Sequence, residues 1–289
     1  MALTKSEWVA LETKAHELRS LCLDTTHWAG SGHIGGGLSC MDMLVMLYYK
    51  YLNLSDDPNW EDRDRFILSK GHAGIAWAPV LVSKGWNDAE QLKTFNLTGS
   101  RMGMHLDANK VAGVDASTGS LGHGLSIAVG TALAARVTKK DYWTYCILGD
   151  GECDEGEVWE GAMAAAHYGL HKLITFVDRN QCMIDGPTED VMKLEPFAEK
   201  WKGFGFLVRE VDGQNLDELD DAIAFAKANE TGKPVAIIAN TKKGAGIKAI
   251  EGDYTWHYGA MDDAAYEAGR KSLEEYYQAR LARAQKEGK

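Results

Sequence analysis

The chain has 289 residues, 45% of them hydrophobic and 25% charged, and its net charge of -11 excludes the basic footprint needed for nonspecific nucleic-acid binding. No apolar run approaches the roughly 18 residues of a membrane-spanning helix, and the charged beginning of the chain is unlike a signal peptide. The five cysteines are scattered, without a C-x-x-C pair, which is typical of reduced thiols in a cytoplasmic protein. From the charge and the lack of a long apolar run, we expect neither a nucleic-acid nor a membrane partner.

Helices and apolar strands alternate along most of the chain. Apolar residues at helical spacing predict a first helix over 5–28, and the stretch SGHIGGGLSC ends it before a second helix at 41–51, which Ser39 can cap. The predicted strands are 65–69, 144–148, 173–178, 205–211 and 234–240. Further helices are predicted at 122–137, 156–168 and 215–229. Strands that are apolar on both faces and separated by helices predict an α/β fold, with a parallel sheet covered by helices on both faces.

We expect a single domain over residues 1–289, made of three parts. These are a helical segment to about residue 60, an α/β core over about 61–260 and a C-terminal helix over about 262–285. The stretch 95–119 is long and has no periodicity, and a loop of that length inside a compact domain indicates a functional segment.

Two consecutive strands end in polar residues that could hold a metal. The first strand leads into Gly-Asp-Gly, residues 149–151, and the second leads into VDRNQC, residues 177–182. Ligands of open α/β sheets bind at the carboxyl ends of the strands, so we expect Asp150 and Asn180 to lie close together. A carboxylate, an amide oxygen and a loop carbonyl suit Mg²⁺ or Ca²⁺, and Gly151 permits a diphosphate to approach the backbone. Alone, Gly-Asp-Gly could be an ordinary turn; the asparagine on the next strand end favours a site.

Histidines and acids are the other candidates. Four of the nine histidines lie in loops flanked by Gly, Met or aromatic residues, where catalytic groups concentrate: His33, His72, His105 and His257. Beyond Asp150, the acidic stretch that follows contains Glu152, Asp154 and Glu157, which we interpret as ordinary helix-start residues that complement the helix dipole.

The ordered motifs of the chain resemble those of the transketolase family. They are SGHIGGG, SKGHAG, MGMHLD, DASTGSLGHGLS, GDGECDEGEVWEG, VDRNQCMIDG and WHYGA. The resemblance covers nearly the whole chain but only the N-terminal, thiamine-diphosphate-binding half of a transketolase. The resemblance therefore implies that the chain has the diphosphate-domain fold and is one subunit of a split, two-chain transketolase.

The resemblance also implies roles for individual residues. The metal ligands would be Asp150, Asn180 and the main-chain carbonyl of Cys182. The cofactor-binding residues would be His72, Gly119, Ser120, Leu121, Gly151, Asn180 and His257. The catalytic residues would be His33, His105, His257 and Glu155, with Glu155 and Glu160 at a subunit interface. Family members often have proline at the positions of Ile34 and Ser120. These two differences do not affect the side chains to which the resemblance assigns chemical roles.

The implied activity is transfer of a two-carbon ketol unit from a ketose phosphate to an aldose phosphate through thiamine diphosphate, with Mg²⁺, or Ca²⁺ or Mn²⁺ in its place. The family's second half supplies a glutamate and an aromatic wall for the cofactor's pyrimidine ring. No segment here resembles that half. We therefore expect the chain to be inactive unless a C-terminal partner subunit is present, and we expect the two chains to form an α₂β₂ assembly.

Several alternatives stay open at this point. The chain could belong to another split thiamine-diphosphate enzyme, such as an oxoacid dehydrogenase component, or resemble deoxyxylulose-phosphate synthase. It could also be a non-catalytic cofactor-binding paralogue. An NAD-binding protein is disfavoured because no G-x-G-x-x-G follows the first strand. Pentose phosphates are the default substrates, and other or sulfonated sugars would use the same chemistry.

Overall fold

The computed structural model describes residues 3–286, so residues 1–2 and 287–289 of the expected domain lie outside the described residues. Its centre is a sheet of five parallel strands in the order β1-β2-β3-β5-β4. The strands are β1 (Arg65–Leu68), β2 (Thr144–Gly149), β3 (Leu173–Arg179), β4 (Leu207–Asp212) and β5 (Val235–Asn240). Each predicted strand is present, and the α/β fold with a parallel sheet is confirmed.

Alternating side chains of the strands enter two separate cores, one on each face of the sheet. Ile67, Cys146 and Val177 pack under α5 (His123–Thr138), α6 (Gly156–His167) and α8 (Phe197–Gly203). The neighbouring residues Leu68 and Ile147 face the opposite core. Helices α1 (Lys5–Ala29), α3 (Met41–Met46), α4 (Gly74–Ser83) and α9 (Leu216–Lys227) cover that side. This two-sided burial explains why the strands other than the edge strand β4 are largely apolar.

The segment after the first helix differs from the prediction. α1 starts with a capping box between Thr4 and Glu7 and ends at Gly30 in the left-handed conformation. The following glycine-rich stretch forms a further buried helix, α2 (Ile34–Ser39), because its small residues can pack closely against α4. Ser39 does not cap α3; its hydroxyl donates to Asp178 instead, at 2.6 Å. The predicted helix 41–51 continues beyond α3 only as a π-helical turn, Leu47–Tyr51.

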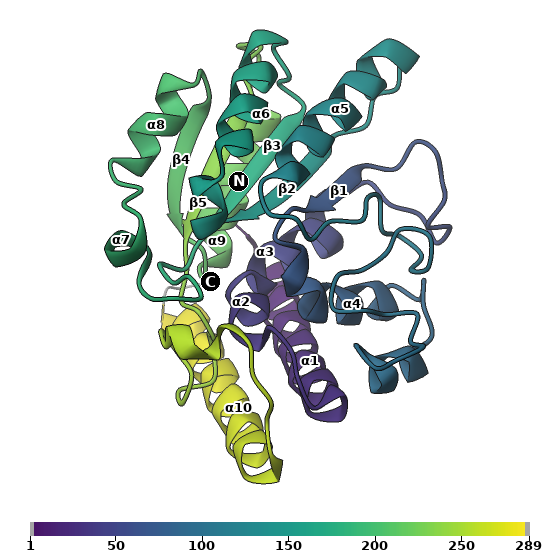
Figure 1. Cartoon of the computed structure of the whole chain (residues 1–289), viewed down its shortest axis with the longest axis vertical. Coiled ribbons are helices and arrows are strands. Elements are labelled where there is room, and N and C mark those ends of the chain that lie inside the picture. The colour runs from purple at the N-terminus through teal and green to yellow at the C-terminus, as the bar shows by residue number, and fades with distance from the viewer. Residues whose placement is uncertain (1–2, 287–289) are drawn as a thin grey trace.

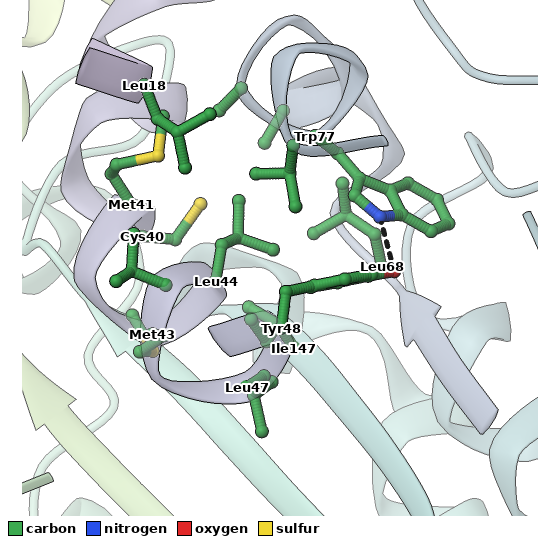
Figure 2. Packing of buried hydrophobic residues seen from close by; sticks show 14 of the residues in the cluster. Leu18, Cys40, Met41, Met43, Leu44, Leu47, Tyr48, Leu68, Trp77 and Ile147 are labelled. Carbon is green, nitrogen blue, oxygen red and sulfur yellow. Dashed lines mark hydrogen bonds between the residues drawn. The ribbon is translucent and has the colours of Figure 1, made fainter. Parts of the chain in front are cut away.

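Figure 2 shows the core between α1, α3, α4 and the sheet. Leu18, Met41 and Leu44 interlock there, and each is fully or almost fully buried. The one polar pair in this view is the indole N–H of Trp77, which donates to the hydroxyl of Tyr48 at 2.7 Å. The buried indole and phenol thus satisfy each other and join α4 to the π-helical turn Leu47–Tyr51.

The remaining elements are short, apart from the last helix. They are α7 (Thr188–Val191) and four 3-10 turns at Gly71–Ala73, Ala89–Thr94, Gly151–Asp154 and Tyr254–His257. The last helix, α10 (Asp263–Lys286), runs along α1, and the two extend together away from the sheet (Figure 1). Among the described residues, no helix is both long and apolar enough to cross a membrane.

A buried ionic cluster joins α10 to α1 and α3. Asp42 is fully buried and accepts hydrogen bonds from two guanidinium groups, those of Arg19 at 2.6 Å and Arg280 at 3.1 Å. Arg280 also donates to the carboxylate of Glu12 at 2.9 Å. Burial alone would raise the pKa of Asp42, but the two arginines hold it below its ordinary value.

Replacing Asp42 by asparagine should destabilise the chain strongly, because it leaves two buried guanidinium groups without their shared counter-charge. We expect a loss of about 3–5 kcal/mol in the free energy of unfolding, measured by urea denaturation. The matched control is Glu17→Gln in the exposed Lys14–Glu17 pair, which should cost less than about 1 kcal/mol. Equal losses for the two variants would contradict a stabilising role of the cluster.

Candidate active site

The candidate site begins at the carboxyl ends of β2 and β3, which are neighbours in the sheet. Their register places Gly149 opposite Asp178, so Asp150 and Asn180 follow at the same edge, as the sequence predicts. Asp150 is only 2% exposed, and its Oδ2 accepts the backbone N–H of Gln181 at 2.7 Å. The carboxylate is therefore held in place by the loop that follows the neighbouring strand.

The amide of Asn180 has a fixed orientation. Its Nδ2 donates to the carboxylate of Asp178 at 3.1 Å, and its Oδ1 accepts the backbone N–H of Cys182 at 3.1 Å. Because the buried carboxylate can only accept, the amide nitrogen must face it and the amide oxygen must face the other way. An oxygen donor is thereby presented on the same loop as the carbonyl of Cys182.

A cavity of about 260 Å³ lies at this edge of the sheet, near the lower end of the volumes of small-molecule sites, roughly 300 Å³. Seven predicted site residues line it: His72, Leu121, Asp150, Gly151, Asn180, Cys182 and His257. Eight other residues complete the lining: Gly36, Lys70, Gly149, Glu152, Met183, Ile184, Asp185 and Lys243. Strand ends and loops that are far apart in the sequence thus meet at this cavity.

The donor set at the cavity fits a hard divalent cation that shares its coordination with a ligand. Within residues 3–286, no group of three or more His, Cys, Asp and Glu side chains is placed to hold a metal. The predicted set has instead one carboxylate, one amide oxygen and one main-chain carbonyl, and Mg²⁺ commonly completes so small a protein set with phosphate oxygens and water. Burial and the neighbouring Asp178 raise the pKa of Asp150, and a cation would offset that unfavourable charge.

Two lysines at the cavity carry the charge that a diphosphate needs, and neither is among the residues predicted from the sequence. Lys70 follows β1 in the SKGHAG motif, and Lys243 follows β5; both are 1% exposed. Burial lowers the pKa of Lys243 to about 8. Its Nζ lies 3.0 Å from Nδ1 of His257 and donates to the carbonyl of Cys182 at 3.4 Å. The strand-end rule that located Asp150 would have found both lysines if applied to every strand.

The interpretation of Glu152 as an ordinary helix-start residue is wrong. Glu152 is 3% exposed and lies in the 3-10 turn Gly151–Asp154, before α6 begins. Its carboxylate accepts hydrogen bonds from Ser69, from the backbone of Gly122 and from the backbone of Gly149. The sequence carries no direct signal for this, because the donors lie on segments far apart in the chain.

Three of the four loop histidines lie together in the structure. The ring centroids are 5.0 Å apart for His33 and His72, 5.2 Å for His33 and His257, and 5.1 Å for His72 and His257. An antiparallel bridge between Gly32 and Gly259 fixes the two loops that carry His33 and His257, with N–H to carbonyl distances of 2.9 and 3.0 Å. The cluster therefore rests on backbone hydrogen bonds, in addition to side-chain packing.

Burial keeps these imidazoles neutral. Burial, together with the smaller effect of the charge of Lys243, lowers the pKa of His33 to about 4 and that of His257 to about 3. Burial also holds the pKa of His72 well below its ordinary value, and the charge of Lys70 is the largest effect after burial. Neutral imidazoles can accept protons, which is what a general base requires.

The other predicted residues lie around this centre. His105, whose pKa burial lowers, packs against Gly119: a Cβ there would be 3.2 Å from the imidazole. Ser120 is exposed and precedes Leu121 on the same loop. Glu155 is exposed, at the start of α6, and is not among the residues that line the cavity.

Comparisons with known proteins agree on one family. Residues 11–278 match the family described as transketolase, thiamine diphosphate binding domain. The chain is 40% identical over 281 residues to a 6-deoxy-6-sulfo-D-fructose transketolase subunit of a Clostridium species, covering 97% of this chain and 98% of that one. It is 39% identical over 268 residues to an apulose-4-phosphate transketolase subunit of Phocaeicola vulgatus, covering 92% and 94% of the two chains.

Full-length relatives are matched over less than half of their length. The structure superposes on transketolase from Campylobacter jejuni with a TM-score of 0.85 at 29% identity, over 95% of this chain but 45% of that one. Human transketolase is 36% identical over 254 residues, which are 86% of this chain and 39% of the human one. The chain therefore corresponds in extent to the subunit relatives and to one part of the longer enzymes.

The neutral state of His33 predicts a pH dependence of stability. Its pKa of about 4 in the folded chain lies below the ordinary value of 6.5, so the unfolded chain binds more protons between these pH values. Stability is then fully present above pH 6.5 and falls as the pH drops toward 4. In His33→Asn, urea denaturation across this range should show a shallower loss than in the parent chain. His167→Asn, at an exposed position in α6, serves as the control. A loss as steep in His33→Asn as in the parent would contradict the assignment.

Proposed function

The chain belongs to the transketolase family, of which it carries the thiamine diphosphate binding domain, and we propose that it is one subunit of a two-chain enzyme that transfers a two-carbon ketol unit. The observation that carries this proposal is the convergence of Asp150, Asn180, His72 and His257 on one cavity, with the ring of His33 packed against both histidines. Hard oxygen donors beside neutral proton acceptors suit a metal-bound diphosphate cofactor next to a sugar.

Metal and diphosphate binding divide among the residues at the strand ends. Asp150, Asn180 and the carbonyl of Cys182 would hold Mg²⁺, and Ca²⁺ or Mn²⁺ would also suit these oxygens. Gly151 and His72 would contact the diphosphate, with Lys243 as an additional positive charge. Thiamine diphosphate, when bound, supplies the carbon nucleophile that the side chains of this chain lack.

The histidines would handle the protons of the sugar. We assign His33 and His257 to the substrate's carbonyl and hydroxyl groups, and His105 to a terminal hydroxyl of the donor. Both rings are neutral near pH 7, so each has an unprotonated ring nitrogen that can accept a proton. Leu121, with Gly119 and Ser120, would form the wall beside the cofactor rings.

A second subunit is part of the proposal. Two of the most similar relatives are named as subunits. Leu121 and Ile184 line the cavity and are 37% and 60% exposed, and large apolar side chains left exposed at a cavity are typical of surfaces that another chain covers. Glu155 and Glu160 are exposed, at the N-cap and within α6, and would face the partner. The α₂β₂ assembly and the cytoplasmic location stay predictions.

The substrate is proposed to be a ketose with an anionic group at its far end. The two relatives are named for a sulfonated fructose and for apulose 4-phosphate, which share that feature. These names favour a sugar other than the common pentose phosphates, although pentose phosphates stay among the sugars to be compared. A panel of phosphorylated and sulfonated ketoses, assayed with the partner subunit present, would identify the substrate.

Asp150→Asn should abolish the Mg²⁺ dependence of thiamine diphosphate binding, because the amide removes the only carboxylate of the proposed metal set. We expect at least about a tenfold rise in the cofactor dissociation constant, measured by calorimetry with and without Mg²⁺. The control is Asp154→Asn, an exposed acid of the same stretch. Retention of Mg²⁺-dependent binding in Asp150→Asn would rule out the proposed metal site.

His33→Ala should separate catalysis from cofactor binding. With the partner subunit present, we expect turnover to fall by about 10²- to 10⁴-fold, the usual contribution of a positioned proton acceptor. The dissociation constant for thiamine diphosphate should stay nearly unchanged, whereas His167→Ala should alter neither quantity. Unaltered turnover in His33→Ala would remove this histidine from the mechanism and favour a non-catalytic role for the chain.

A further inference from the structure

Glu152 connects three chain segments through one buried carboxylate. Its Oε1 accepts the backbone N–H of Gly122 at 2.9 Å and also the hydroxyl of Ser69. Its Oε2 accepts the backbone N–H of Gly149 at 3.0 Å. These donors lie after β1, before α5 and at the end of β2, so a single side chain joins three loops at the carboxyl edge of the sheet.

The loop before α5 is held at both of its ends. At the first, the hydroxyl of Thr118 donates to the carbonyl of Leu68 at 2.6 Å. At the second, Gly122 has a φ of 93°, which favours glycine, and directs its N–H at Glu152. Leu121 lies between these anchors, lines the cavity and is 37% exposed. The position of Leu121 therefore depends on the bond between Gly122 and Glu152.

The opposite wall of the cavity depends on the same carboxylate. Gly149, Asp150 and Gly151 line the cavity there, and Gly149 donates to Glu152. Among the described residues, the bond from Gly122 to Glu152 is the one hydrogen bond between residues 119–122 and residues 149–154. A single side chain thus provides the direct hydrogen-bonded link between the two walls.

Two of the three contacts of Glu152 are with backbone N–H groups, which can only donate. All three partners are donors, and a carboxylate offers acceptor sites for each of them. A glutamine could accept through one atom only, and its NH₂ group would face a backbone N–H. Burial raises the pKa of Glu152 above its ordinary value, and the three hydrogen bonds offset this effect only in part. Glutamine at this position is a nearly isosteric change that leaves one of the two backbone N–H groups without an acceptor.

We propose that Glu152 is a positioning residue for thiamine diphosphate, which fixes Leu121 relative to the Gly-Asp-Gly turn and so sets the width of the cofactor cleft. This inference rests on the proposed function and deepens it, because it assigns cofactor affinity to a residue that need not touch the cofactor. The functional consequence is a pre-formed cleft, whose two walls do not have to be ordered when the cofactor binds.

The test compares Glu152→Gln and Glu152→Ala with Asp154→Asn, an exposed acid two residues away. Calorimetry on the full chain with saturating Mg²⁺ should show thiamine diphosphate dissociation constants raised about tenfold in both Glu152 variants. Hydrogen exchange of the cofactor-free chain should become faster in residues 118–123. In complex with the partner subunit, turnover at saturating cofactor should change little, while the half-saturating cofactor concentration rises. Asp154→Asn should resemble the parent chain in every measurement.

Two outcomes would overturn the proposal. One is a lower melting temperature in Glu152→Gln with unchanged exchange in residues 118–123 and an unchanged dissociation constant, which marks a purely structural role. The other is faster exchange spread evenly over the chain. If the parent chain binds thiamine diphosphate neither alone nor in complex with the partner subunit, the proposed function is wrong, and the exchange in residues 118–123 still decides whether Glu152 holds the loop.

Discussion

The buried ion pair between Lys70 and Asp178 is the interaction on which the rest of the site depends. The two residues are 1% and 0% exposed, and their charged groups are in direct contact. Burial alone would lower the pKa of Lys70, but Asp178 raises it, so the ammonium group stays charged. Such a pair is stable only when its remaining hydrogen-bonding capacity is also used. Ser39 and Thr241 donate to Asp178, and Lys70 donates to the carbonyl of Gly36 at 2.6 Å.

The Lys70–Asp178 pair is connected both to the proposed metal ligand Asn180 and, through Ser69, to Glu152. On one side, Asp178 accepts a hydrogen bond from the amide nitrogen of Asn180 and thereby orients the amide oxygen toward the proposed metal. On the other side, Ser69, next to Lys70, donates to Glu152, which holds the two walls of the cavity. The proposed metal ligand Asn180 and the loop of Leu121 are therefore linked to one another through Lys70 and its chain neighbour Ser69. A network in which each member is satisfied in this way makes the site rigid before any ligand binds.

The sequence predicted those features that follow from position along a single strand or helix. Strand apolarity predicted the parallel sheet, and the rule that ligands bind at the carboxyl ends of strands brought Asp150 and Asn180 together. It failed where a residue's partners lie on distant segments. Ser39 looked like a helix cap and instead binds Asp178, 139 positions away. Glu152 looked like a helix-start acid and instead binds Ser69, 83 positions away. In both cases a local role was chemically adequate, so only the folded structure could distinguish it from the distant one.

The lysines also link the binding half of the site to its proton-transfer half. Lys243 lies 3.0 Å from His257, and its charge lowers the pKa of both His257 and His33; Lys70 contributes to each to a smaller extent. The same two ammonium groups are the positive charges that line the cavity. An anion bound there offsets their charge, and opposite charge nearby favours the protonated form of an imidazole. A net negative charge bound there would therefore raise the pKa of His33 and His257. Burial would still oppose protonation of both rings. The charge state of the two histidines is in this way coupled to the charge of what occupies the cavity.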